Sequence, residues 1–191
     1  MAHFVKFNID ELYSNRNTLQ PGGPAAFGCS FTYGTGVKHK HTWPALLGVY
    51  NCGQPGTSND RIVRLAIEYI NTYSPKEIYV MWTMLSRREW VDEEGTTLRF
   101  KVDDSEGNIY RWQEAHVELS NNNYDNYCYK KNVILLQSFC EARNVKLYDM
   151  SVHSLNHTMF PFGSDNSHPG ELWHESVFQH YKVKQVVAKS S

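Results

Sequence analysis

The stretch that most limits the fold is Ile78-Tyr79-Val80-Met81-Trp82, an unbroken run of apolar and aromatic residues. A strand with one face in water alternates apolar and polar residues, so an unbroken run predicts a strand buried on both faces. Such strands occupy the centre of parallel sheets whose two faces are covered by helices. We therefore expect residues 77–82 to form a central strand of a sheet of this kind.

Strand and helix signals alternate on both sides of this run, as the apolar spacing and the turn residues indicate. Further strands are expected at residues 25–29, 49–52 and 145–150, and helices at residues 43–47, about 58–73, 125–143 and 171–187. Either Thr57 or Ser58 can cap the second of these helices. The alternation predicts the α/β class, with a central, mostly parallel sheet between two helical layers. The chain has 191 residues, so a single domain over residues 1–191 is expected.

One segment, at about residues 87–124, departs from this alternation. Within it, the strand-like runs 98–102 and 109–112 flank a polar turn that contains Gly107, which is a β-hairpin signal. We therefore expect a β-hairpin insertion on the surface of the domain.

Composition excludes several classes of function. The formal net charge is −1 and charged residues make up 20% of the chain, so no basic surface for nucleic acid is expected. No apolar run approaches the ~18 residues of a membrane span. The N-terminus lacks the pattern of a secretory signal, which predicts a cytoplasmic location, although a virion-associated protein would lack a signal too. The cysteines have no zinc-site spacing, so we expect four free thiols and no metal site: Cys29, Cys52, Cys128 and Cys140.

A serine stands where catalytic groups gather in folds of this class. The stretch Gly28-Cys29-Ser30-Phe31-Thr32 is expected to form a loop at the carboxyl end of the first strand. Ser30 needs a base, and Asp165 and His168 lie three residues apart before the last helix. The carboxylate can accept the imidazole Nδ1–H, which leaves Nε2 to take the serine proton. The alternatives are that Ser30 is an ordinary turn residue and that Asp165 only caps the last helix.

These motifs resemble those of a known family, the SGNH (GDSL-type) hydrolases. Gly28-Cys29-Ser30-Phe31-Thr32-x-Gly34 is similar to the first block of that family, and Asp165-x-x-His168-Pro169 is similar to its last block. Gly56-Thr57-Ser58 is similar to the second block, although Gly53 also fits the glycine of that block. The resemblance implies a three-layer α/β/α sandwich of the flavodoxin-like SGNH type and no cofactor. It also implies ester hydrolysis with Ser30 as nucleophile, His168 as base, Asp165 as its orienting acid and backbone N–H groups of Ser30 and Gly56 as oxyanion donors.

The chain departs from the family in the third block, where an asparagine usually follows a G-x-N-D pattern. Here the sequence reads Trp82-Thr83-Met84-Leu85-Ser86-Arg87, without an asparagine. Thr83, Ser86 or Arg87 are the replacement donors to consider, and the W-T-x-x-x-R pattern resembles SGNH-like proteins of tailed bacteriophages and marine microbes.

Two functions therefore follow from the resemblance. The first is a serine esterase or carbohydrate O-deacetylase, such as an acetylesterase, that acts on a small-molecule or carbohydrate ester through an acyl-enzyme. The second is a binding module on the same scaffold, with carbohydrate as its candidate ligand, in which the triad is weak or inactive. The complete set of Ser30, Asp165 and His168 favours the enzyme, and the missing asparagine favours the binding module.

Overall fold

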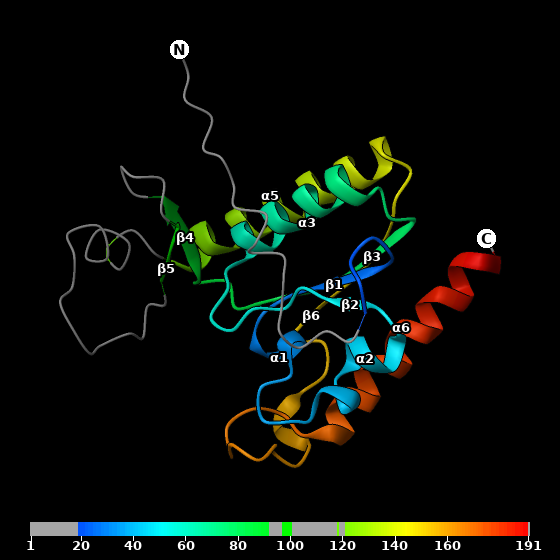
Figure 1. Ribbon diagram of the computed structural model, residues 1–191. Helices are drawn as coiled ribbons and strands as arrows, with labels where there is room; N and C mark the ends of the chain where they lie inside the picture. The colour runs from blue at the N-terminus through cyan, green and yellow to red at the C-terminus, as the bar shows by residue number, and fades with distance from the viewer. Residues whose placement is uncertain (1–18, 92–96, 101–117, 119–120, 191) are drawn as a thin grey trace.

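The computed structural model describes residues 19–91, 97–100, 118 and 121–190 (Figure 1). Its main sheet has four strands in the order β2-β1-β3-β6, and every neighbouring pair is parallel. These strands are β1 (Ala25–Phe27), β2 (Tyr50–Asn51), β3 (Glu77–Trp82) and β6 (Lys146–Ser151). The prediction of a central strand at residues 77–82 is confirmed, because β3 lies between β1 and β6.

Helices cover both faces of this sheet. Helices α3 (Asn59–Tyr73) and α5 (Asn122–Ala142) lie on one side, and α2 (Trp43–Leu47) and α6 (Glu171–Ser190) lie on the other (Figure 1). The expected α/β class, with a parallel sheet between two helical layers, is therefore confirmed.

Each helical layer has its own core, and β3 contributes to both. Val80 and Trp82 pack with Ala66 of α3 and Leu136 of α5. Tyr79 and Met81 pack with three α6 side chains that have no exposed surface, at i, i+4 and i+8: Trp173, Val177 and Tyr181. The two-residue period of a strand thus divides the apolar run between the two cores.

Side-chain caps explain where two helices begin. Ser58, rather than Thr57, caps α3, and its hydroxyl accepts the N–H of Arg61 at 3.2 Å. Helix α5 begins three residues before the predicted position 125, because Asn121 accepts the N–H of Tyr124 at 3.0 Å and caps it there.

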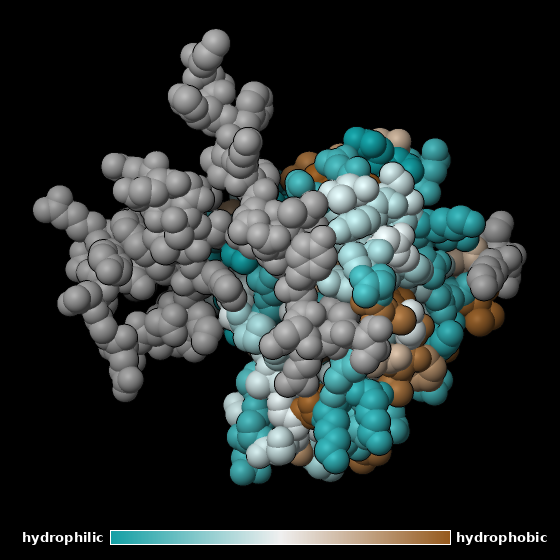
Figure 2. Space-filling view, in the orientation of Figure 1, coloured by the Kyte–Doolittle hydropathy of each residue, from teal (hydrophilic) through white to brown (hydrophobic). Residues whose placement is uncertain are grey.

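Leu172, in the first turn of α6, is apolar but 55% exposed. The buried stripe starts at Trp173, one residue later, and a shift of one residue rotates a side chain by about 100° around a helix. Apolar residues of α6 also reach the surface near its end, at Val183, Val186 and Val187. Figure 2 shows brown patches among the mostly teal described surface on the side where α6 lies.

A small second sheet stands where the insertion was expected. Strands β4 (Arg88–Val91) and β5 (Thr97–Phe100) pair antiparallel, with Arg88 opposite Phe100. The expected partner of residues 98–102, at residues 109–112, lies outside the described residues, as does the turn at Gly107.

All four cysteines are free and buried, as expected. Within the described part of the chain, no helix combines the length and the apolar character that crossing a membrane requires.

Candidate active site

Ser30 lies in the first turn of a short helix, not in the loop that the sequence suggested. Helix α1 (Ser30–Tyr33) begins three residues after the end of β1, with Cys29 as its N-cap. The carbonyl of Cys29 accepts the N–H groups of Thr32 at 3.0 Å and of Tyr33 at 2.9 Å. Gly34, with φ of 83°, ends the turn in the left-handed region. The N–H of Ser30, being in the first turn, has no acceptor within the helix.

Gly28 lets this turn pack against the end of β3. A Cβ at Gly28 would lie 2.1 Å from Thr32 Oγ1 and 2.9 Å from the carbonyl oxygen of Met81. No side chain fits there, so the glycine fixes how closely α1 approaches the neighbouring strand.

Asp165 and His168 form the hydrogen bond that the spacing suggested. His168 Nδ1 and Asp165 Oδ2 are 2.5 Å apart, with the two side chains 24% and 30% exposed. Asp165 Oδ1 also accepts the backbone N–H groups of His168 at 3.0 Å and of Ser167 at 3.1 Å. These bonds, led by the one from the His168 backbone, lower the pKa of Asp165 to about 2. An ionised Asp165 accepts a proton-bearing Nδ1 and leaves Nε2 as the free basic nitrogen.

The loop of this pair rests on the segment that follows α1. The carbonyl of Gly36 accepts the Ser164 N–H at 2.8 Å. A Cβ at Gly36, where φ is 83°, would lie 2.6 Å from Asp165 Oδ1. The loop of Asp165 and His168 therefore lies against the segment that follows α1. No hydrogen bond joins Ser30 to His168 within the described residues; such bonds are often long in unliganded sites and tighten when substrate binds.

Phe31, the residue after Ser30, connects α1 to His168. Its ring meets three others edge to face, with centroid separations of 5.2 Å to His157, 5.8 Å to His168 and 5.4 Å to Trp173. This aromatic cluster was not foreseen, because its members are far apart in the sequence.

The register of the sheet brings Thr83 and Gly56 to the same edge as Ser30. Phe27 is paired with Val80, so Ser30 and Thr83 each stand three residues beyond paired positions. Gly56, with φ of 72°, lies in a turn in which the Thr57 N–H donates to the Gln54 carbonyl at 3.3 Å. The Gln54 N–H in turn donates to the Gly28 carbonyl at 2.9 Å, which ties this turn to the start of α1.

Asn59 holds the backbone of Thr83. Its Oδ1 accepts the Thr83 N–H at 2.8 Å, and its Nδ2 donates to the Thr83 carbonyl at 3.3 Å. The Thr83 hydroxyl oxygen accepts Arg87 Nη1 at 2.9 Å. The Thr83 N–H is thus engaged, and the buried Thr83 side chain is hydrogen-bonded to the half-buried Arg87. Sequence reasoning missed Asn59, whose only signal was an amide in the first turn of a helix beside the second block.

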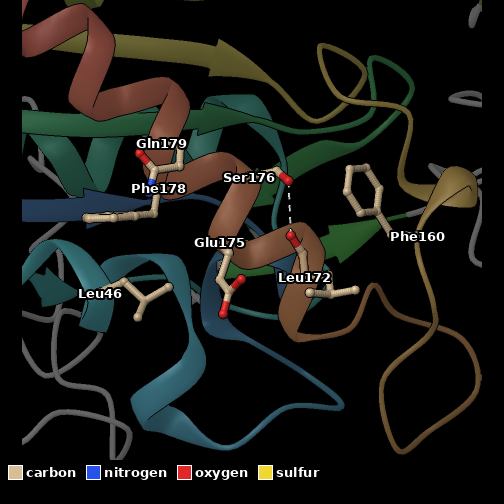
Figure 3. Close-up of a pocket in the computed structure, with 7 residues that line it drawn as sticks. All are labelled: Leu46, Phe160, Leu172, Glu175, Ser176, Phe178 and Gln179. Atoms are coloured by element: carbon tan, nitrogen blue, oxygen red, sulfur yellow. Dashed lines mark hydrogen bonds between the residues drawn. The ribbon is translucent and has the colours of Figure 1, made fainter.

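Two surface hollows lie close to these elements. A groove of about 730 Å³ runs between α2, α6 and the loop before α6, and its lining includes Leu46, Phe160 and Phe178. Figure 3 shows these side chains with Ser176, whose hydroxyl donates to the Leu172 carbonyl at 3.0 Å. A second hollow, of about 380 Å³, lies against the Gly163-Ser164 backbone. Neither lining includes Ser30, His168 or Asp165, so chemistry rather than a cavity identifies the candidate site.

Metal-binding residues do not gather at the site. No group of three or more histidine, cysteine, aspartate or glutamate side chains in the described segments could hold a metal ion.

Comparisons with known proteins give structural neighbours alone. No protein-family model and no curated protein sequence matches the chain. A GDSL-like lipase from Bacteroides thetaiotaomicron is similar at 14% identity and a TM-score of 0.42, with 88% of this chain covered but only 65% of the lipase. The psychrotrophic esterase EstA from Pseudoalteromonas sp. is similar at 13% identity and a TM-score of 0.44, over 87% of this chain and 99% of EstA.

GDSL-type lipases and esterases are thus among the solved structures that this chain resembles. The phage or marine-microbial branch is not supported by them. Because the identities and TM-scores are low, the chemistry of this chain has to be judged from its own residues.

Proposed function

We propose that the protein is a serine hydrolase of the SGNH type that cleaves carboxylic esters. The observation that carries the proposal is the Asp165–His168 pair, whose loop is hydrogen-bonded to the segment that follows the Ser30 helix. The proposed roles are Ser30 as nucleophile, His168 as general base and Asp165 as the group that fixes the tautomer of His168.

In the proposed reaction, Ser30 Oγ bonds to the ester carbonyl carbon while its proton passes to His168 Nε2. The proton then moves to the leaving alcohol as the carbon–oxygen bond breaks. A water molecule, deprotonated by His168, attacks the acyl-enzyme, releases the carboxylic acid and restores Ser30. The Ser30 and Gly56 N–H groups are the proposed oxyanion donors, and loss of one such donor commonly costs ~3 kcal/mol of transition-state stabilisation.

Thr83 and Arg87 are the proposed substitutes for the family's third-block asparagine. The Thr83 N–H is taken by Asn59 and its buried hydroxyl accepts from Arg87, so Thr83 would act by holding the half-buried Arg87 guanidinium toward a substrate. Arg61 and Arg64 pair with Glu89, and Arg88 pairs with Asp125. Arg87, in contrast, forms no ion pair within the described residues. We assign Arg87 to substrate or oxyanion binding, and the substrate class to small-molecule or carbohydrate-linked esters.

The test is turnover of p-nitrophenyl acetate together with labelling by a fluorophosphonate. Ser30→Ala should abolish both, and His168→Ala should lower kcat by about 10³-fold or more. Ser176→Ala is the matched control, because the Ser176 hydroxyl bonds to its own helix. Ser176 also lines a groove that contains none of the proposed catalytic residues. A wild-type protein that neither turns over the ester nor forms the adduct contradicts the proposal.

The second candidate is a carbohydrate-binding module with an inactive triad. It is favoured by the threonine at position 83 and by the absence of a Ser30–His168 hydrogen bond within the described residues. Glycan binding that is unchanged by Ser30→Ala, in a protein without esterase activity, would establish this candidate instead.

A further inference from the structure

Arg61 is hydrogen-bonded both to the turn before α3 and to strand β4. Its side chain lies in the first turns of α3 and is almost fully buried, with 4% of the residue exposed. Nε donates to Gln54 Oε1 at 3.0 Å, and Nη1 donates to Glu89 Oε1 at 3.4 Å. One guanidinium therefore contacts the turn that carries Gly56 and the first strand of the insertion.

Gln54 is the residue through which Arg61 acts on that turn. Its carbonyl accepts the Thr57 N–H and its own N–H donates to the Gly28 carbonyl. Both backbone groups and the side chain of Gln54 are therefore engaged, which fixes the residue that stands two positions before Gly56.

Glu89 is the second anchor of Arg61. Its side chain is 7% exposed and also accepts two bonds from Arg64, at 2.6 Å and 3.1 Å. Two guanidinium groups thus share one buried carboxylate, and removing that carboxylate takes an ion-pair partner from both of them. The position of β4 therefore bears directly on the position of Arg61.

We propose that Arg61 is a positioning residue for the turn of residues 54–57, whose Gly56 N–H is a proposed oxyanion donor. Glu89 of the insertion holds Arg61 in place. The insertion then affects the reaction through a buried ion pair as well as through any contact with substrate. This inference rests on the proposed function, because it assumes that the Gly56 N–H stabilises the transition state.

Arg64 supplies a matched control for the kinetic test. It lies on the same helix and pairs with the same carboxylate, since its Nε and Nη2 donate to Glu89 at 3.1 Å and 2.6 Å. Arg61→Gln should lower kcat for p-nitrophenyl acetate by about 10-fold or more with KM within about twofold, as loss of transition-state stabilisation requires. Arg64→Gln should leave both constants within about twofold. Equal losses of kcat in the two variants overturn the proposal.

Gln54 gives a second arm that keeps the Arg61–Glu89 ion pair intact. Gln54→Leu should reproduce the kcat loss of Arg61→Gln, and the double variant should be no worse than either single one, since both act through one contact. This arm decides the matter if Arg61→Gln does not fold, and an unchanged kcat in Gln54→Leu contradicts the inference.

Amide hydrogen exchange separates failure of this inference from failure of the proposed function. A wild-type protein without esterase activity refutes the proposed function alone. In that case, exchange in the peptide spanning residues 53–57 still tests the positioning. We expect at least about 10-fold faster exchange in Arg61→Gln than in Arg64→Gln, and equal rates overturn the positioning role.

Discussion

His174 should make the stability of this protein depend on pH above the range in which carboxylates titrate. The residue lies on α6 and has no exposed surface. Its Nδ1 accepts the Trp43 N–H at 3.2 Å, so that nitrogen carries no proton and the ring is neutral. Burial lowers the pKa of His174 from 6.5 to about 3.

The sign and size of the effect follow from linkage between protonation and folding. Between pH 6.5 and about 3, the unfolded chain holds a proton at this histidine and the folded chain does not. Stability therefore falls as pH decreases through that window. A pKa of 6.5 in the unfolded chain gives a loss of about 1.4 kcal/mol between pH 7.5 and 5.5, and about 2.7 kcal/mol between pH 7.5 and 4.5. In the upper window the folded-state pKa lies far below the working pH, so the loss depends on the unfolded state.

The assay is urea unfolding followed by tryptophan fluorescence, in steps from pH 7.5 to 4.5. His174→Asn keeps an acceptor for the Trp43 N–H and removes the titrating ring, so its free energy of unfolding should lose about 1.4 kcal/mol less by pH 5.5. His153→Asn is the control, since His153 is exposed. His180, whose pKa is also lowered by burial, is present in all three proteins and cancels. The reasoning is refuted if His174→Asn loses as much stability as the wild type over the same interval.

Three further predictions concern the candidate site. Gly36→Ala should lower kcat at least about 10-fold, because the new Cβ would lie 2.6 Å from Asp165 Oδ1 and the positive φ adds about 1–2 kcal/mol of strain; unchanged ester kinetics would contradict it. Asp165→Asn should lower kcat by about 10³-fold or more while the thermal unfolding midpoint changes little, since an amide cannot hold His168 in the required tautomer; a small kinetic effect argues against the triad. Asn59→Ala should destabilise the protein by about 1–3 kcal/mol in urea unfolding, because it leaves the buried Thr83 N–H without its partner; a change below about 0.5 kcal/mol would show that the bond contributes little.

Features that depend on residues close together in the sequence could be predicted from it. The run 78–82 revealed the central strand, because a strand buried on both faces has to be apolar throughout. The three-residue spacing of Asp165 and His168 revealed their hydrogen bond, since both partners lie in one loop. Helix α1 was missed because four residues are too few to show a helical period.

Contacts between distant segments had no such signal. Arg61 and Glu89 are 28 positions apart, and neither residue type indicates its partner. The same holds for Asn59 and Thr83, which are 24 positions apart. Both links depend on how α3 lies against the sheet, which is settled by packing of the whole domain rather than by any local pattern.

The topology of the parallel sheet determines the order in which the residues of the candidate site are synthesised. Ser30 and the three strands around it emerge within the first half of the chain, whereas His168 follows the last strand. Trp173, which contacts Phe31, belongs to the helix that closes the second core over Tyr79 and Met81. Ser30 and His168 can therefore come together only after the segment that contains His168 and α6 has been synthesised and α6 has packed on the sheet. A nascent chain should become competent for the proposed reaction only after helix α6 has been synthesised.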